Sequence, residues 1–337
     1  MFEIPLLLIF IIVVALVFDF TNGAHDCANA IATVVSTKVL TPRTAVAMAA
    51  ILNLIGALLG TKVALTLGSG IVRPEVVSGS QILVLAALLG AIAWNSITWY
   101  FGIPSSSSHA LIGGLMGAAL AHAGVDSLNG MSIISKVVVP LVLSPVSGFI
   151  VGLLFMGLIS IVFFRVNRPL ANRIFRKSQI FSAGAMALSH GLNDAQKTMG
   201  IITLALLIFG QIEVIHVPLW VKIACALAMA AGTAVGGWKI VKTMGHKIFK
   251  LEPVHGFAAE TSAGIVIGCA SMFGAPISTT HTITASIFGV GATKRLSAVR
   301  WGIAGDLIIA WILTIPASAL VGAISFFIIR LILNLLS

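Results

Sequence analysis

The chain has 337 residues, of which 58% are hydrophobic and 9% are charged, whereas a soluble domain carries about 25% charged residues. With a mean hydropathy of +1.10, this composition excludes an ordinary soluble protein and predicts an integral membrane protein rather than a disordered chain. The net charge of +10 would also suit a nucleic-acid partner. The sequence contains no nucleic-acid-binding motif. In a membrane protein the positions of the basic residues, rather than their sum, indicate how the spans are oriented.

Three cysteines, Cys27, Cys225 and Cys269, lie far apart in apolar sequence. Their spacing indicates neither a disulfide framework nor a structural zinc site, so we expect small buried side chains. The N-terminus lacks the basic region of a signal peptide, and we expect the first apolar run to be a retained span.

Apolar runs that are too long for strands and show no alternation predict helices throughout the chain. They occupy 4–38, 44–71, 80–122, 133–164, 181–210, 217–238, 255–292 and 301–334. The runs 80–122 and 255–292 are each broken by a polar turn, at 102–109 and 274–281. Each broken run predicts a re-entrant hairpin or a broken helix pair.

Basic residues test this topology, because positively charged loops stay in the cytoplasm. Fourteen of the 20 basic residues fall in four clusters, at 38–43, 165–177, 239–250 and 294–300. All four clusters lie on one side only if each broken run enters and leaves the membrane by the same face. This condition supports the hairpin interpretation independently of the turns.

Three crossings and one hairpin in each half make the second half an inverted copy of the first. We predict an all-α integral membrane protein of two inverted repeats, 1–164 and 179–337, joined by a basic cytoplasmic linker at 165–178, with both termini outside. Two pairs of motifs support the duplication: residues 23–29 match 191–197 at an offset of 168, and the two polar turns match at an offset of 172.

Asp26 and Asp194 each lie within an apolar run, where an ionised carboxylate costs at least a few kcal/mol. Such residues mark ion paths, and we expect both to bind the coupling cation, with sodium at Asp26 and Asp194. The alternative is structural: each aspartate caps a half-helix or pairs with a buried base such as Lys197.

Other polar residues flank the two aspartates and either coordinate ions or satisfy unwound backbone. We expect Asn22 and Asn193 to contact an anion, and Asn29 to contact a cation, while His25 and His190 are auxiliary candidates.

The polar turns bring hydroxyls to the start of apolar helices, where free N–H groups and the helix dipole favour an anion. The candidate anion ligands are Ser105, Ser106, Ser107 and Ser108 in the first turn, and Ser278, Thr279 and Thr280 in the second. One such turn would be explained by ordinary N-capping. Two turns at equivalent places in opposed repeats would converge at the bilayer midplane, which favours binding of an oxyanion.

His109 and His281 follow the hydroxyls at equivalent positions. They are auxiliary candidates that bridge the anion or carry protons, or else are satisfied histidines. Glu260, in the segment 256–261, is a candidate cation ligand without a counterpart, because the equivalent position is Leu88.

At these residues the sequence resembles the PiT family of inorganic phosphate transporters, whose signatures are written G-A-N-D-x-A-N and G-x-N-D-x-x-K. This chain has G-A-H-D-C-A-N and G-L-N-D-A-Q-K, together with P-S-S-S-S-H, P-I-S-T-T-H and G-F-A-A-E-T. The resemblance spans essentially the whole chain. His25 replaces the usual Asn, Asn53 stands where some relatives have Glu, and the central loop is short, which points to a prokaryotic member.

The resemblance implies a multi-pass protein of the cytoplasmic membrane, a homodimer, that imports inorganic phosphate by symport with sodium or protons. Sodium is a co-substrate, and no other cofactor is implied. Oxygen ligands favour sodium, and alternating access would follow from rocking of the repeats around a fixed site. A divalent-metal transporter using the His and Asp residues is the main alternative, although it leaves the hydroxyl turns unexplained. An intramembrane enzyme is disfavoured, because Ser108 and His109 are neighbours that do not face each other on a helix.

Overall fold

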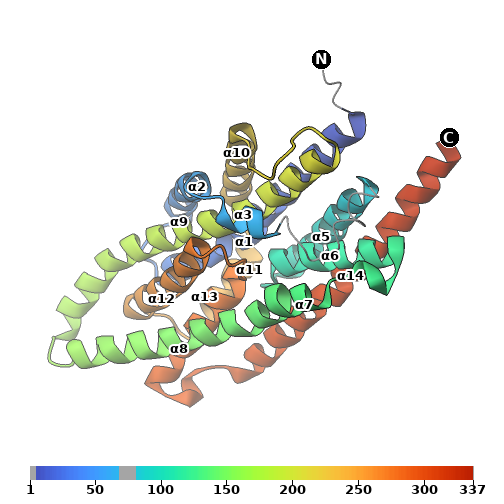
Figure 1. The fold of residues 1–337 in the computed structure, drawn as a ribbon. Helices are drawn as coiled ribbons and strands as arrows, with labels where there is room; N and C mark the ends of the chain where they lie inside the picture. Colours follow the sequence, from blue (N-terminus) through green and yellow to red (C-terminus); the bar gives the residue numbers. More distant parts are fainter. Residues whose placement is uncertain (1–4, 68–80, 337) are drawn as a thin grey trace.

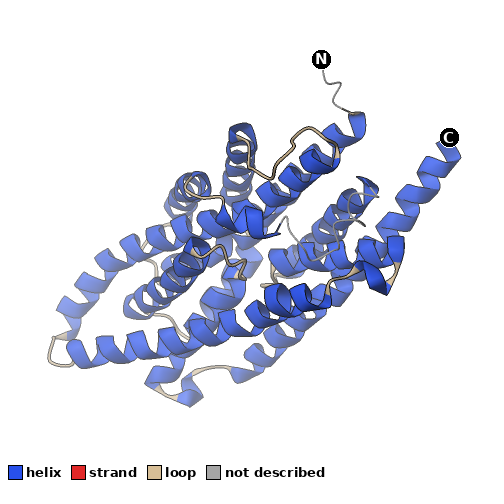
Figure 2. Cartoon of the chain, viewed as in Figure 1, coloured by secondary structure: helices blue, strands red, loops and turns tan. Residues whose placement is uncertain are grey.

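The computed structural model describes residues 5–67 and 81–336, and the regular elements that Figure 2 draws there are helices. The predicted runs are confirmed as helical, and the parts of them at 4, 68–71 and 80 lie outside the described residues. In chain order (Figure 1) the main helices are α1 (Leu6–Ser36), α2 (Pro42–Leu58), α3 (Lys62–Leu67), α5 (Gln81–Phe101), α6 (Ser107–Ala123), α7 (Gly130–Ile133), α8 (Val139–Val162), α9 (Arg168–Ile208), α10 (Leu219–Val235), α11 (Trp238–Lys242), α12 (Pro253–Met272), α13 (Thr279–Lys294) and α14 (Trp301–Leu336).

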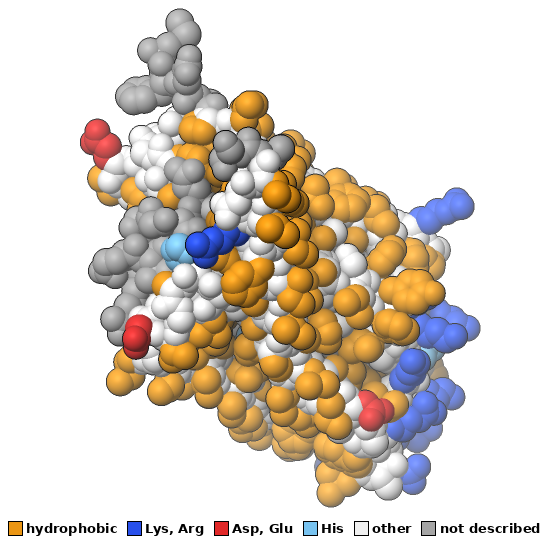
Figure 3. Space-filling view, turned by 90° about the vertical axis from the view of Figure 1, so that its right-hand side faces the viewer, with side chains coloured by type: hydrophobic (Ala, Val, Ile, Leu, Met, Phe, Trp, Pro, Cys, Tyr) orange, Lys and Arg blue, Asp and Glu red, His pale blue; other side chains and the backbone are white. Residues whose placement is uncertain are grey.

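Several of these helices are long and apolar enough to cross a bilayer. Among the described residues four pass this test alone, and Leu219–Val235 passes it together with Trp238–Lys247 across a bend of 61°. A wide apolar surface covers most of the face seen in Figure 3, while Lys and Arg side chains gather along one edge. The surface therefore has the charge asymmetry that the four basic clusters predict for a membrane protein.

The two polar turns are confirmed as breaks between paired helices, α5 with α6 and α12 with α13. Gly102 (φ 70°) and Gly274 (φ 71°) adopt the left-handed conformation at equivalent points of the two turns. A residue without Cβ adopts that conformation at little cost, so each glycine ends one helix and allows the chain to reverse. Ser106 and Ser278 then begin α6 and α13 as N-caps.

The central linker differs from the expected loop. Asn167 caps α9 by accepting a hydrogen bond from the Leu170 backbone N–H at 3.0 Å, and Pro169 occupies the first turn. Because the cap and the proline both favour helix initiation, the basic residues from Arg168 onward lie on the first turns of a 41-residue helix. The connection between α8 and α9 is therefore shorter than the predicted 165–178 linker.

Helices of the two halves of the chain pack against each other. Helix α1 packs on α10 while α2 packs on α9, and α6 packs on α14 while α13 packs on α8. The bundle in Figure 1 is thus built from helices that exchange partners between the halves. Each half therefore buries apolar faces against the other, in addition to packing within itself, where α5 contacts α6 and α12 contacts α9.

Glycines allow these exchanged helices to cross at backbone contact, as in other membrane bundles. A Cβ atom at Gly23 would lie 2.3 Å from the Met229 carbonyl oxygen, and one at Gly191 would lie 2.2 Å from that of Asn53. Gly23 and Gly191 are separated by the motif offset of 168, so the α1–α10 and α9–α2 crossings are equivalent. This equivalence is what a duplicated fold predicts.

Candidate functional site

Asp26 occupies the middle of α1, where it is buried and surrounded by hydrogen-bonding side chains. Its Oδ1 lies 2.6 Å from His25 Nδ1 and accepts from the Thr280 hydroxyl at 3.2 Å, while its Oδ2 accepts from the Ser107 hydroxyl at 3.3 Å. Thr280 belongs to α13 and Ser107 to α6, so the first turns of both hairpin helices meet α1 at this carboxylate.

Asp194 occupies the equivalent place on α9 but has a different set of partners. Lys197 donates to Asp194 Oδ1, to the Ser108 hydroxyl and, at 3.0 Å, to the carbonyl oxygen of Ile277. The other oxygen of Asp194 accepts from Thr279 Oγ1 at 2.8 Å and lies 3.0 Å from His190 Nε2. The pairing of Asp194 with a buried base, one of the alternatives left open by the sequence, is therefore present.

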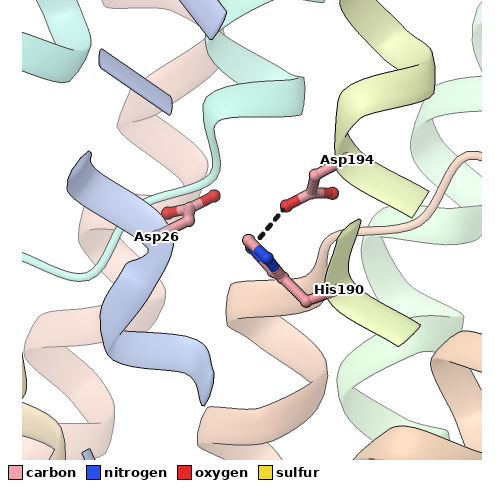
Figure 4. A group of neighbouring side chains, drawn as sticks. All are labelled: Asp26, His190 and Asp194. Carbon is pink, nitrogen blue, oxygen red and sulfur yellow. Dashed lines mark ion pairs between the residues drawn. The ribbon is translucent and has the colours of Figure 1, made fainter. Parts of the chain in front are cut away.

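The two aspartates face each other across the crossing of α1 and α9. Ligand atoms of Asp26, His190 and Asp194 all lie within 4.8 Å of one another. In Figure 4 His190 points at Asp194, and Asp26 approaches from the opposite helix. This group brings together two carboxylates and an imidazole, a donor set that suits a bound cation.

Six of the seven candidate hydroxyls form two groups, and Ser105 stands apart from both. Ser106 and Ser278 accept hydrogen bonds from the backbone N–H groups of His109 and His281, at 3.3 and 3.2 Å, so the N-capping alternative describes these two residues. The central group, Ser107, Ser108, Thr279 and Thr280, contacts the carboxylates or Lys197 instead.

Ser105 lies to one side of this centre. Its hydroxyl contacts Thr98 Oγ1 at 2.9 Å and His25 Nε2 at 3.3 Å, and His25 Nε2 also lies 3.0 Å from Thr98 Oγ1. His25, the residue that departs from the family signature, thus joins Asp26 to a pair of hydroxyls on α5 and its turn.

The asparagines that flank the aspartates are not equivalent. Asn29 donates to Thr280 Oγ1 at 2.9 Å and to Thr279 Oγ1 at 3.3 Å, which places it in the centre. Asn193 instead donates to Ser271 Oγ on α12 at 2.8 Å. Asn22 is buried, and its amide oxygen has no hydrogen-bond partner.

His109 and His281, the histidines of the two turns, lie next to each other. The ring centroids of His109 and His281 are 5.0 Å apart, and the His281 ring stacks on Trp311 of α14 at 4.0 Å. Both histidines are buried. Their pairing joins the first turns of α6 and α13, which is consistent with the equivalence of the two turns.

Comparisons with known proteins agree with this geometry. Residues 22–322 match the model of the phosphate transporter family. A protein of Bacillus subtilis (strain 168) and one of Rhizobium meliloti (strain 1021), each bearing the name "probable low-affinity inorganic phosphate transporter", are 48% and 51% identical, over 97% and 95% of this chain and 98% and 96% of their own lengths. A solved structure titled "The sodium-dependent phosphate transporter" superposes with a TM-score of 0.89 at 25% identity and covers 97% of this chain and 100% of its own.

The chain belongs to the phosphate transporter family. The PiT resemblance and the all-helical membrane fold are confirmed, and the members it matches are transporters rather than enzymes. The identities of nearly half over almost the full length also explain why all four motifs are present in order. The chain is therefore a phosphate transporter.

Glu260 lies apart from the two aspartates of the transporter. It is buried on α12, where Oε1 accepts from Thr33 at 2.5 Å and Gln179 at 3.0 Å, and Oε2 accepts from Ser182 at 2.5 Å. Its carboxylate thus joins the C-terminal part of α1 to the N-terminal part of α9 through three donors.

Sequence reasoning missed several residues that complete these networks, among them Thr98, Gln179 and Thr33. A helical-wheel reading would have indicated Thr33, because it lies seven residues, about two turns, after Asp26 on the same face of α1. Thr98 and Gln179 carry no comparable signal, since their contacts arise from packing between helices that are distant in sequence.

Proposed function

We propose that this transporter imports inorganic phosphate by symport with sodium and alternating access. The observation that supports the proposal is the convergence of two helix N-termini, those of α6 and α13, on Asp26 and Asp194. Free N–H groups and hydroxyls at helix N-termini bind oxyanions, whereas carboxylates bind cations. A site that contains both kinds of group suits an anion that arrives together with cations.

The hydroxyls suggest how the two substrates are coupled. In the structure Ser107, Thr279 and Thr280 donate to the aspartates. A sodium ion that binds the carboxylate oxygens competes with those hydroxyl protons, which then become available to phosphate oxygens. Binding of sodium therefore raises the affinity for phosphate, and by linkage phosphate raises the affinity for sodium to the same extent.

Lys197 makes Asp26 the principal sodium ligand in this proposal. The Lys197 ammonium already compensates the charge of Asp194, whereas among the described residues the ion pair of Asp26 is with the histidine His25 rather than with a lysine or arginine. A dianionic or monoanionic phosphate placed next to an uncompensated carboxylate would be repelled. Sodium shared between Asp26 and Asp194 removes this repulsion, and Asn29 supplies a further oxygen ligand nearby.

The repeats, the orientation and the assembly are proposed from the same pattern. We place both termini outside and the basic edge of Figure 3 in the cytoplasm, in the cytoplasmic membrane, with the chain as a homodimer. The equivalent crossings at Gly23 and Gly191 support an inverted repeat.

Uptake of labelled phosphate into proteoliposomes tests the coupling. We expect accumulation with an inward sodium gradient at constant pH, and little uptake when potassium replaces sodium. Uptake driven equally well by a pH gradient without sodium would assign the coupling to protons, through His25 and Asp26. The Asp26, His190 and Asp194 group would also suit a divalent cation, so uptake that requires a divalent cation and ignores sodium would contradict sodium symport.

A further inference from the structure

A third buried carboxylate, Asp19, lies outside the centre described above. It is on α1, seven residues and hence about 10.5 Å before Asp26 on the same helical face, and its side chain is 0% exposed. The Thr198 hydroxyl of α9 donates to Oδ1 at 2.9 Å. The other carboxylate oxygen, Oδ2, has no hydrogen-bond partner.

The neighbours of Asp19 are polar but include no base. Asn22, one turn further along α1, and Cys225 of α10 interact with the carboxylate. The Asn22 amide oxygen is buried and unpartnered. Among the ion pairs of residues 5–67 and 81–336, none includes Asp19, and the nearby Asp194 adds repulsion.

Glu260 shows what a structurally satisfied carboxylate looks like in this protein. Both of its oxygens accept hydrogen bonds, from three donors in all. Asp19 has the Thr198 hydroxyl on Oδ1, weaker polar interactions with Asn22 and Cys225, and an Oδ2 without a hydrogen-bond partner, although a buried carboxylate without a base is costly in a membrane protein. The helix crossing itself does not require an acid, because the position equivalent to Asp19 in the second half is Ala187.

We propose that Asp19, Asn22 and Thr198 form a second sodium site, separate from the Asp26, His190 and Asp194 group. The ligands are a carboxylate oxygen, an amide oxygen and a hydroxyl oxygen from two helices, which is the donor chemistry of a hard cation. A sodium ion there would coordinate Asp19 Oδ2 and the Asn22 amide oxygen, which have no hydrogen-bond partner. It would also shield Asp194 from Asp19, so it would assist phosphate binding at the centre.

The inference rests on the proposed function only for the identity of the ion, so its test avoids transport. Binding of ²²Na⁺ to the detergent-solubilised protein without phosphate counts the sites directly. We expect Asp19→Asn to bind one fewer sodium ion per chain than the parent, Asp26→Asn to lose a different one, and the double variant to lose both. Asp306→Asn, the same change at an exposed position on α14, should bind as the parent does.

A second variant separates loss of the ligand from loss of the fold. Asn22→Ala keeps the carboxylate and should weaken sodium binding at one site by about tenfold or more, without lowering the melting temperature measured in potassium. Sodium counts and affinities equal to those of the parent in both variants would overturn the proposal. That result would indicate that Asp19 is protonated and neutral instead of binding sodium. Phosphate uptake that ignores sodium would overturn the symport proposal alone, because the ²²Na⁺ count would still test Asp19.

Discussion

Lys197 makes the two central aspartates chemically different, although the repeat makes them equivalent in position. Its ammonium is buried and hydrogen-bonded to Asp194, Ser108 and the carbonyl oxygen of Ile277. The residue equivalent to Lys197 in the first motif is Asn29, which is neutral. The centre therefore has one compensated and one uncompensated carboxylate, and the two should respond differently to substitution.

We predict that Asp26→Asn and Asp194→Asn both abolish gradient-driven uptake, but that only Asp194→Asn destabilises the fold. Removal of Asp194 leaves the Lys197 ammonium buried without its counter-ion, which costs about 3–5 kcal/mol of unfolding free energy. Asp26→Asn leaves the Lys197–Asp194 ion pair intact. Melting temperatures in detergent without sodium or phosphate measure the difference.

The double variant Asp194→Asn with Lys197→Met supplies the control, because it removes both charges together. Its melting temperature should return toward that of the parent, while uptake stays absent. Equal melting temperatures for the two single variants would show that the Lys197 pair contributes nothing to stability.

The hydroxyl turns allow a second comparison at the residue scale. Ser106→Ala and Ser278→Ala remove N-caps, which costs about 1 kcal/mol of stability each. Ser107→Ala and Thr279→Ala remove donors that face the carboxylates, and loss of a hydrogen bond to a charged ligand costs about 1.5–3 kcal/mol of binding. We expect the first pair to melt earlier and the second pair to bind phosphate about tenfold or more weakly.

Binding of labelled phosphate in saturating sodium, with melting curves in its absence, separates these effects. If Ser107→Ala and Thr279→Ala bind phosphate normally and only melt earlier, the anion site does not use these hydroxyls.

At the scale of helices, the crossings of α1 with α10 and of α9 with α2 position the aspartates. Each crossing is in backbone contact at a glycine only three residues before an aspartate, Gly23 before Asp26 and Gly191 before Asp194. A Cβ atom there would collide with the facing carbonyl oxygen and push the helices apart. The glycines of the two signatures therefore set how closely α10 and α2 approach the helices that carry the two aspartates.

We predict that Gly23→Ala and Gly191→Ala lower the melting temperature and reduce uptake strongly. A Cβ atom at either position would lie 2.2–2.3 Å from a backbone carbonyl oxygen, which cannot move aside without a shift of the whole helix. Overpacking of this kind costs about 1–3 kcal/mol. Gly157→Ala on α8, where nothing lies within 4 Å of the added atom, is the control and should behave as the parent in both measurements.

At the level of the whole molecule, the packing between the halves bears on how the proposed alternating access would work. Rocking of the sequence halves against each other would require each half to be a body of its own. Instead α6 packs on α14 and α13 on α8, so the outer helix of each half holds the hairpin of the other. Under the alternating-access proposal, we expect the moving bodies to comprise helices from both halves.

Topology is tested by labelling single cysteines in a background without Cys27, Cys225 and Cys269. We expect Asp126→Cys to react with a membrane-impermeant thiol reagent from outside, and Lys177→Cys to react only from inside. Both positions are exposed, whereas the neighbouring Ser127 is buried and unsuitable. Reaction of the two positions from the same face would contradict the inverted repeat.

The membrane class, the helices, the two broken pairs and the family could all be predicted from the sequence. Composition and long apolar runs specify spans, and Gly102, Gly274 and their following caps act within a few residues of their own position. For the same reason Asp26 and Asp194 were identifiable, because a charge in an apolar run is conspicuous without any knowledge of its neighbours.

Only the tertiary structure decided which polar groups meet. The contacts of Asp26 with Thr280, Glu260 with Thr33, and Asp19 with Thr198 join residues far apart in the chain. Local patterns carry no information on such partners, because helix packing brings them together. The same packing determines that Cys269 is exposed rather than buried and that Asp19 retains an oxygen without a partner, whereas the Asp194–Lys197 pair and the Ser106 cap are local contacts.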